Sequence, residues 1–294
     1  MCDHDSLDDM LKYRLASGEL SRRSFGALTI GASLVSMLPA VASADGVEVK
    51  ESDVDIKTSD GSCDAHFAHP AKGAHSAVLV WPDIFGLRPA FKQMGKRLAE
   101  SGYAVLTINP FYRKQHAPTA PEHPDFNDPP TRTALFALAG SLTPETAVTD
   151  AKAFVSWLDG QKAVDKKRKM GTTGYCMGGP FTMRTAAAFP DRVGAGASFH
   201  GGNLVTDKPD SPHLLVPKMK AQFLFAIAEN DAMRQPEQEP TLREAFAKAN
   251  LPAVVEVYKG TMHGWCPPDA AVYNHDQAEK AWSAMLDLFK RALV

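Results

Sequence analysis

The sequence predicts an α/β protein whose central sheet is mostly parallel and is flanked by helices on both faces. Two observations lead to this prediction. Short apolar runs alternate along the chain with segments of helical periodicity, which is typical of parallel strands joined by helices. Residues 45–294 contain neither a Gly/Ser-rich linker nor an internal repeat, and one large α/β domain accommodates a stretch of this length.

The first predicted elements follow from short patterns. They are strands Val47–Thr58, Cys63–Ala68 and Ala77–Trp81, a helix from Pro89 to Gly102, and strand Tyr103–Ile108. Ala77–Trp81 is apolar throughout, so we expect it to be buried on both faces of the sheet. The helix is indicated by Phe91, Met94 and Leu98 at helical spacing. Pro89 suits its first turn and Gly102 its end.

The remaining elements alternate in the same way. They are helix Pro144–Leu158, strand Lys169–Thr173, helix Phe181–Phe189, strands Val193–Phe199 and Gln222–Ala228, helix Thr241–Ala249, strand Ala253–Tyr258, and a closing amphipathic helix over Ala278–Phe289. The proline-rich stretch His116–Pro130 interrupts this alternation. Long irregular insertions in compact domains are often lids or binding loops, which is the expectation here.

Composition excludes several classes of function. The chain has 294 residues, 32 Lys+Arg against 34 Asp+Glu, and a formal net charge of −2, so electrostatics do not favour a nucleic acid or an anionic membrane as partner. Its four cysteines form no CxxC motif, which argues against a disulfide framework or a zinc knuckle. We expect no metal, because Asp, His and Cys show no ligand spacing, and no dinucleotide cofactor.

The N-terminus carries an export pattern. Arg22 and Arg23 precede a weakly apolar stretch from Gly26 to Leu38, and Ala42-Ser43-Ala44 has the form of a cleavage site. This resembles a twin-arginine signal peptide. Residues 1–44 are therefore predicted to engage the twin-arginine export machinery and be removed. The domain of residues 45–294 would then be periplasmic or secreted, with no stable membrane insertion.

The sharpest motif is Gly174-Tyr175-Cys176-Met177-Gly178-Gly179, which lies between a predicted strand and a predicted helix. A G-x-nucleophile-x-G sequence in this context is the nucleophile elbow of α/β hydrolases, here with Cys in place of Ser. Side chains at Gly174 or Gly178 would collide with neighbouring elements. Cys176 would face the N-terminus of the following helix, whose partial positive charge favours a thiolate.

Two further residues complete the order of a catalytic triad. In this fold an acid and then a histidine follow the nucleophile. Asp231 follows strand Gln222–Ala228 and His263 follows strand Ala253–Tyr258, so both are expected in loops at the carboxyl edge of the sheet. Glu229 is the alternative acid. His200, at the end of another strand, is the alternative histidine but precedes the acid in the chain.

With these residues the chain resembles the dienelactone hydrolase (carboxymethylenebutenolidase) family. Three other segments are similar to the family: Trp81–Pro89, with its acidic-Ile-Phe-Gly core, Asn109–Lys114, and His263-Gly264-Trp265 with the helix that follows. The resemblance covers most of residues 45–294. It implies a single α/β-hydrolase domain and a cysteine hydrolase of small lactones or activated esters that works through a thiol acyl-enzyme.

The resemblance also implies roles for individual residues. Cys176, His263 and Asp231 would form the triad. The backbone N–H groups of Ile84 and Met177 would form the oxyanion hole. Asp83 would take the place of an acid that controls the ionisation of the thiol, although the family usually has the longer Glu.

Substrate recognition follows the family less closely. Tyr112, Arg113, Lys114 and Trp265 would contact substrate, but the family's second carboxylate-binding arginine is replaced by Pro267. Since a charge-assisted hydrogen bond contributes about 1.5–3 kcal/mol, a dienelactone carboxylate would bind at least roughly tenfold more weakly.

Two other classes of function remain open at this point. The chain could be a thiol redox protein with Cys176 as the reactive thiol, or a non-catalytic α/β-hydrolase-like binding protein. Neither requires a nucleophile, an acid and a histidine in this order. Cys63 and Cys266 could pair as a disulfide in an oxidising compartment.

Overall fold

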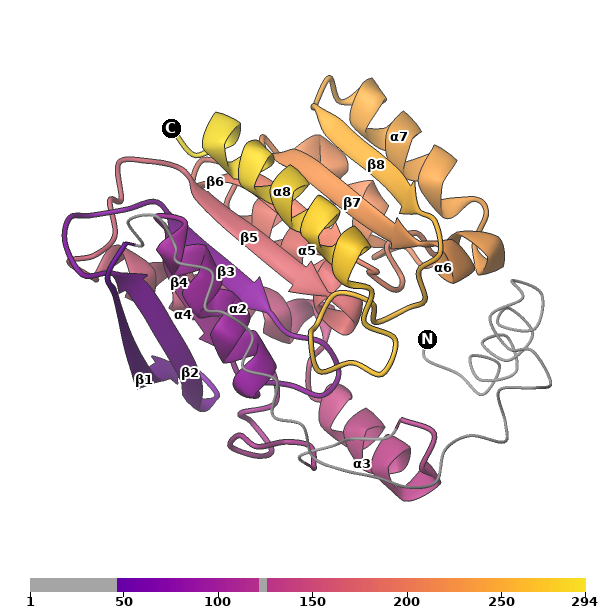
Figure 1. Cartoon of the computed structure of the whole chain (residues 1–294). Helices are drawn as coiled ribbons and strands as arrows, with labels where there is room; N and C mark the ends of the chain where they lie inside the picture. The colour runs from indigo at the N-terminus through magenta and orange to yellow at the C-terminus, as the bar shows by residue number, and fades with distance from the viewer. Residues whose placement is uncertain (1–46, 122–125) are drawn as a thin grey trace, which may run out of the picture. The chain divides into compact units, whose positions relative to one another are not determined.

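The computed structural model describes residues 47–121 and 126–294, and the predicted export signal lies outside them. Within these residues one eight-stranded sheet has the order β1-β2-β4-β3-β5-β6-β7-β8 (Figure 1). The strands are β1 Val49–Thr58, β2 Gly61–Pro70, β3 Ala77–Trp81, β4 Ala104–Ile108, β5 Met170–Tyr175, β6 Val193–Phe199, β7 Gln222–Ala228 and β8 Ala253–Tyr258. β2 pairs antiparallel with both β1 and β4, and all other neighbours are parallel. The predicted mostly parallel sheet is confirmed.

The helices cover both faces of this sheet. They are α2 Pro89–Glu100, α3 Pro129–Ala139, α4 Pro144–Asp159, α5 Gly179–Ala188, α6 Glu229–Arg234, α7 Gln238–Lys248 and α8 His275–Ala292, with 3₁₀ turns η2 Cys176–Gly178 and η3 Pro212–Lys218. α2 and α8 lie in front of the sheet in Figure 1, with α4, α5 and α7 behind it.

Each face of the sheet has its own hydrophobic core. Along β3, Leu79 packs in one core and Val80 in the other, because successive side chains of a strand point to opposite faces. The core behind the sheet contains Phe154 of α4, and the core in front contains Phe91 of α2 and Phe289 of α8. Burial on both faces explains why the apolar run at Ala77–Trp81 is continuous.

Three short helices were not predicted, and α3 is the most informative. It begins inside the predicted proline-rich loop, at Pro129. Asp128 accepts a hydrogen bond from the backbone of Thr131, so an N-cap followed by Pro in the first turn starts this helix. The helix α6 and the turn η3 also fall in segments that we expected to be irregular.

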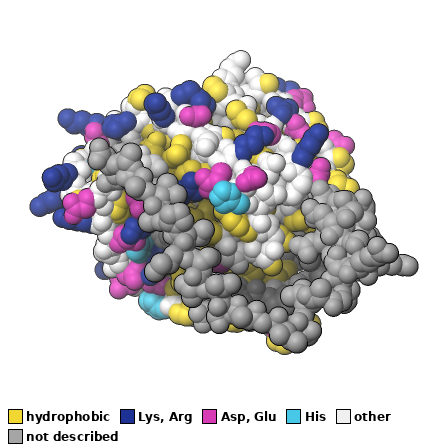
Figure 2. Space-filling model, viewed as in Figure 1, with side chains coloured by type: hydrophobic (Ala, Val, Ile, Leu, Met, Phe, Trp, Pro, Cys, Tyr) yellow, Lys and Arg dark blue, Asp and Glu magenta, His cyan; other side chains and the backbone are white. Residues whose placement is uncertain are grey.

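The surface around α2 and α8 carries interspersed charges of both signs (Figure 2). Arg97 of α2 pairs with Glu279 of α8 at 2.6 Å, and Lys96 pairs with Glu51 of β1 at 2.7 Å. These exposed pairs connect neighbouring elements and contribute little stability individually. Among the described residues, none of the helices combines the length and the hydropathy that crossing a bilayer requires.

Candidate active site

The elbow forms where the sequence predicts it. β5 ends at Tyr175, and Cys176 opens the 3₁₀ turn η2, which leads directly into α5. Cys176 has a φ of +52°, a left-handed conformation that residues other than glycine adopt rarely. Such strain at the junction of a buried strand and a helix is characteristic of functional positions. The Cys176 side chain is 7% exposed.

The two outer glycines of the motif are required by close packing. A Cβ on Gly178 would clash with the carbonyl oxygen of Trp81 and lie 2.7 Å from that of Pro82. A Cβ on Gly174 would clash with the carbonyl of Gly178 and lie 2.9 Å from Thr182. The elbow therefore packs directly against the chain segment that follows β3, which carries Ile84.

The acid and the histidine meet the thiol at the carboxyl edge of the sheet. His263 Nε2 lies 3.0 Å from Cys176 Sγ, and His263 Nδ1 lies 2.7 Å from Asp231 Oδ2. Asp231 lies in α6 directly after β7, in a short helix rather than in the expected loop. The three predicted residues are thus joined by one imidazole, although they come from three separate parts of the chain.

Neighbouring residues hold this imidazole in place. The backbone N–H of His263 donates to Asn230 Oδ1 at 2.8 Å. Glu229, the alternative acid, accepts from the backbone N–H of Gly260 at 3.0 Å and so ties the start of the His263 loop to α6. Gly264 has a φ of +97°, which lets the chain turn immediately after His263. Asn230 and Glu229 are supports of the loop that sequence reasoning did not assign.

His200, the alternative histidine, lies directly beside His263. The centres of the two rings are 5.1 Å apart, in an edge-to-face arrangement. His200 is 1% exposed, and neither of its ring nitrogens has a hydrogen-bond partner among the described residues. Burial, and secondarily the nearby His263, lower the pKa of His200 well below 6.5, so this ring is neutral.

Asp83 has a different partner from the one we expected. Its two carboxylate oxygens accept hydrogen bonds from Arg88 at 2.7 and 3.0 Å, and Oδ1 also accepts from the backbone of Phe85. Although burial opposes it, the carboxylates of Asp83 and Asp269 raise the pKa of Arg88. In this structure Asp83 is the ion-pair partner of Arg88, and its control of the thiol stays a prediction.

Arg88 joins two segments that flank the elbow. It also donates to both oxygens of Asp269, at 2.6 and 3.0 Å, and Asp269 follows His263 in the same loop. One guanidinium thus connects the segment that carries Ile84 with the loop that carries His263. Met177 directly follows Cys176 in the elbow and is partly exposed. Ile84 is 6% exposed and lies two residues after Pro82, whose carbonyl packs against Gly178.

The predicted substrate residues Tyr112 and Arg113 have structural partners instead. Arg113 forms a bidentate pair with buried Asp150 at 2.7 Å and also binds Asp60. The Tyr112 hydroxyl lies 2.6 Å from Asp150 and 2.8 Å from Thr58. We call these five residues the Arg113 cluster. Since its members satisfy one another between β1 and α4, the cluster indicates a structural role for Tyr112 and Arg113, and their contact with substrate stays a prediction.

The other two predicted substrate residues differ in exposure. Trp265 is completely buried, with its ring 4.9 Å from that of Tyr258 and 6.5 Å from that of His200. Its ring packs against that of His200, which indicates a supporting role, and its contact with substrate stays a prediction. Lys114 is exposed to solvent.

Cys63 and Cys266 are both free and buried. Burial raises the pKa of each thiol, so both stay protonated and unreactive at neutral pH.

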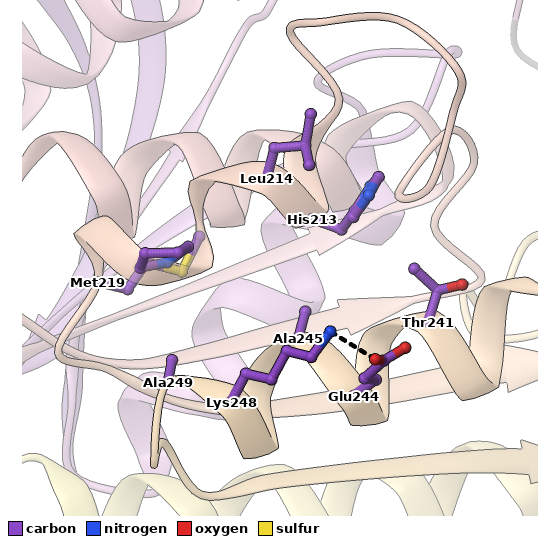
Figure 3. Close-up of a pocket in the computed structure, with 9 residues that line it drawn as sticks. His213, Leu214, Met219, Thr241, Glu244, Ala245, Lys248 and Ala249 are labelled. Atoms are coloured by element: carbon purple, nitrogen blue, oxygen red, sulfur yellow. Dashed lines mark ion pairs between the residues drawn. The ribbon is translucent and has the colours of Figure 1, made fainter.

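A separate pocket of about 490 Å³ lies between η3 and α7 (Figure 3). Leu214 and Met219 line one side of it, and the ion pair of Glu244 with Lys248 lines the other. The triad residues are not part of its lining. Among residues 47–121 and 126–294, no cluster of three or more His, Cys, Asp or Glu side chains could hold a metal ion.

The sheet order, the strained elbow and the acid and histidine that follow it define an α/β hydrolase. Comparison with known proteins gives the particular family. The profile of the dienelactone hydrolase family matches residues 63–293, and the chain belongs to this family, whose members hydrolyse ester and lactone bonds.

The individual relatives share only 22–28% of their sequence with this chain. A putative carboxymethylenebutenolidase of Escherichia coli strain K12 is 28% identical over 233 residues, which are 77% of this chain and 82% of that protein. The carboxymethylenebutenolidase of Rhodococcus opacus is 26% identical over 225 residues, 75% of this chain and 83% of that protein. The crystal structure of a putative dienelactone hydrolase from Klebsiella pneumoniae superimposes with a TM-score of 0.72 at 22% identity, covering 83% of this chain and 99% of that one.

Proposed function

We propose that this protein is a cysteine hydrolase of lactones or activated carboxylic esters that works through a Cys176–His263–Asp231 triad. The observation that carries the proposal is the single imidazole placed 3.0 Å from the thiol and 2.7 Å from the carboxylate. Membership of a hydrolase family supports the reaction class.

The first half of the reaction forms an acyl-enzyme. His263 Nε2 takes the proton of Cys176 Sγ, and Asp231 holds the opposite nitrogen and stabilises the imidazolium. The thiolate attacks the carbonyl carbon of the ester or lactone. The negative charge that develops on the carbonyl oxygen is accepted by the backbone N–H groups of Ile84 and Met177. The close packing of Gly178 against the carbonyls of Trp81 and Pro82 supports this pairing of donors.

The second half releases the product. His263 returns its proton to the departing alkoxide, so the carbon–oxygen bond breaks and a thioester remains on Cys176. The imidazole then takes a proton from a water molecule, which attacks the thioester. Collapse of this intermediate breaks the carbon–sulfur bond, yields the carboxylate and restores the thiol.

Substitution of the nucleophile and the base tests this mechanism. We expect Cys176→Ala and His263→Ala each to lower kcat/KM for p-nitrophenyl acetate by at least about 100-fold, since acid–base catalysis contributes roughly 10²–10⁴-fold. Cys63→Ala is the matched control, because it removes a buried, protonated thiol outside the triad, and its kcat/KM should be unchanged.

The same variants separate the two other classes of function. A non-catalytic binding protein would show no turnover above that of the Cys176→Ala variant. A thiol redox protein would consume peroxide or a disulfide through Cys176 without needing Asp231. Retention of esterase activity by Cys176→Ala would disprove the proposed mechanism.

Residues 1–44 are proposed to direct export through the twin-arginine route, with the domain acting in the periplasm or outside the cell. The support is the order of paired arginines, apolar stretch and Ala-Ser-Ala in the sequence. Replacement of Arg22 and Arg23 by Lys should hold the full-length chain in the cytoplasm. A periplasmic protein that still begins at Met1 would contradict cleavage.

A further inference from the structure

Three phenylalanines form a continuous wall of rings. The ring of Phe126 lies between those of Phe85 and Phe136, with centres 6.3 and 5.6 Å away and nearly perpendicular planes. Edge-to-face contacts of this kind are favourable for aromatic pairs. We call these residues the aromatic wall. Phe136 of α3 is 42% exposed, and Phe85 and Phe126 are partly exposed, so the wall presents ring surface to solvent.

The wall begins in the chain segment that packs against the elbow. Phe85 directly follows Ile84, the proposed oxyanion donor, in the segment against which Gly178 of the elbow packs. The guanidinium of Arg88 lies 5.4 Å from the centre of the Phe85 ring and pairs with Asp269 in the His263 loop. Arg88 therefore connects the Phe85 ring with the loop that carries His263. From Phe85 the wall runs towards α3.

The arginines best placed to receive a substrate carboxylate are already occupied by carboxylates of the protein. Arg88 binds Asp83 and Asp269, and Arg113 binds Asp150 and Asp60. Recruiting either arginine for a substrate anion would leave a buried aspartate without its cation, which is strongly unfavourable.

The other cations of this region face competing partners. Lys114 is exposed, so water competes for it. Arg132 lies on α3 one helical turn before Phe136 and one turn after Asp128. Pro267, in the loop that follows His263, offers no charge to a substrate anion.

We propose that, given the hydrolase function above, the aromatic wall is the subsite that selects the substrate, and that the substrate is a neutral ester or lactone. Its apolar ring or chain packs against Phe85, Phe126 and Phe136 while its carbonyl carbon lies at Cys176. A carboxylate on the same chain faces ring surface and must compete with protein carboxylates for Arg88 and Arg113 and with water for Lys114, so it is discriminated against.

A matched pair of substrates tests this proposal on the purified full-length protein. p-Nitrophenyl valerate and mono-p-nitrophenyl glutarate share a leaving group and a chain length, and differ in a terminal methyl against a carboxylate. We expect kcat/KM to favour the valerate by at least about tenfold. Phe136→Ala should raise KM for the valerate by about three- to tenfold, by removing apolar contact area, and leave kcat nearly unchanged. Hydrolysis of p-nitrophenyl acetate, whose acyl chain is too short to reach the wall, should stay the same.

The control and the contrary outcomes are equally specific. Leu214→Ala removes another exposed apolar side chain, in η3, and should change none of these values. Equal rates on the two substrates, or a preference for the glutarate, would overturn the proposal. A glutarate preference that disappears in Arg132→Gln would assign α3 an anion site instead. If the wild-type protein hydrolyses none of the three esters, the hydrolase function itself is refuted. If it hydrolyses the acetate but does not prefer the valerate over the glutarate, only the subsite is refuted.

Discussion

The Arg113 cluster and the pair His200–Trp265 are both buried polar groups, and they differ in whether their polar atoms are satisfied. In the cluster, Arg113 and Tyr112 donate to Asp150, which lies 1% exposed in α4. Within the described residues, the ring nitrogens of His200 and the indole nitrogen of Trp265 have no hydrogen-bond partner. Of these two groups, the unsatisfied pair adjoins His263, through the ring of His200.

Strained backbone is also found beside His263 and Cys176, where the unsatisfied polar atoms lie. His200 has a φ of +39° and Cys176 a φ of +52°, so two of the strained residues lie at the site. Unpaired buried polar atoms and strained backbone both cost free energy, and native proteins keep them mainly where function requires them. We infer that the Arg113 cluster contributes stability and the His200 pair contributes activity.

Removing the cation of the satisfied cluster should have the largest effect. In Arg113→Met, Asp150 stays buried without its ion-pair partner, and we expect the free energy of unfolding to fall by about 3–5 kcal/mol. Urea denaturation measures this change. The kcat/KM of the folded variant for p-nitrophenyl acetate should be unchanged. An Arg113→Met variant with normal stability and reduced activity would show that Arg113 serves the reaction rather than stability.

Replacing His200, the unsatisfied histidine, should make the folded protein more resistant to low pH than the wild type. In the wild type, burial keeps His200 neutral, so the unfolded chain alone gains a proton as pH falls below about 6.5. This residue therefore costs the folded state about 1.4 kcal/mol for each pH unit below that value, and no such loss occurs above it.

The variant His200→Phe keeps an aromatic ring and removes the two unpaired nitrogens. We expect it to lose less stability than the wild type between pH 6.5 and pH 5, measured by urea denaturation at each pH. Its kcat/KM should fall, because the ring against His263 changes. If the two proteins show the same pH dependence of stability, His200 is not held neutral in the folded state.

Local sequence patterns predict the sheet and the proximity of Cys176, Asp231 and His263 well, for physical reasons. A strand buried on both faces must be apolar throughout, as Ala77–Trp81 is, and a tight elbow admits only small residues at Gly174 and Gly178. The order of Cys176, Asp231 and His263 follows the order of the strands. Each of these features depends on residues that are close in sequence or on a fixed topology.

Features set by long-range contacts could not be predicted in the same way. Arg88 and Asp269 are 181 residues apart, so no periodicity reveals that this pair connects the two segments beside the elbow. Arg113 binds Asp150 across 37 residues, and its sequence neighbourhood gives no sign of that partner. The helix α3 did have a sequence signal, Asp128 before two prolines, which the proline-rich composition concealed.

The most direct test of the account is to trap the covalent intermediate. Full-length protein is mixed with p-nitrophenyl acetate, quenched in acid within the first turnovers, digested and analysed by mass spectrometry. We predict an acetyl group on Cys176 through a thioester that hydroxylamine removes, and none on that peptide in the Cys176→Ala variant. Release of p-nitrophenol with the acetyl group on another side chain, or with no acetylated peptide at Cys176, would contradict the proposed nucleophile.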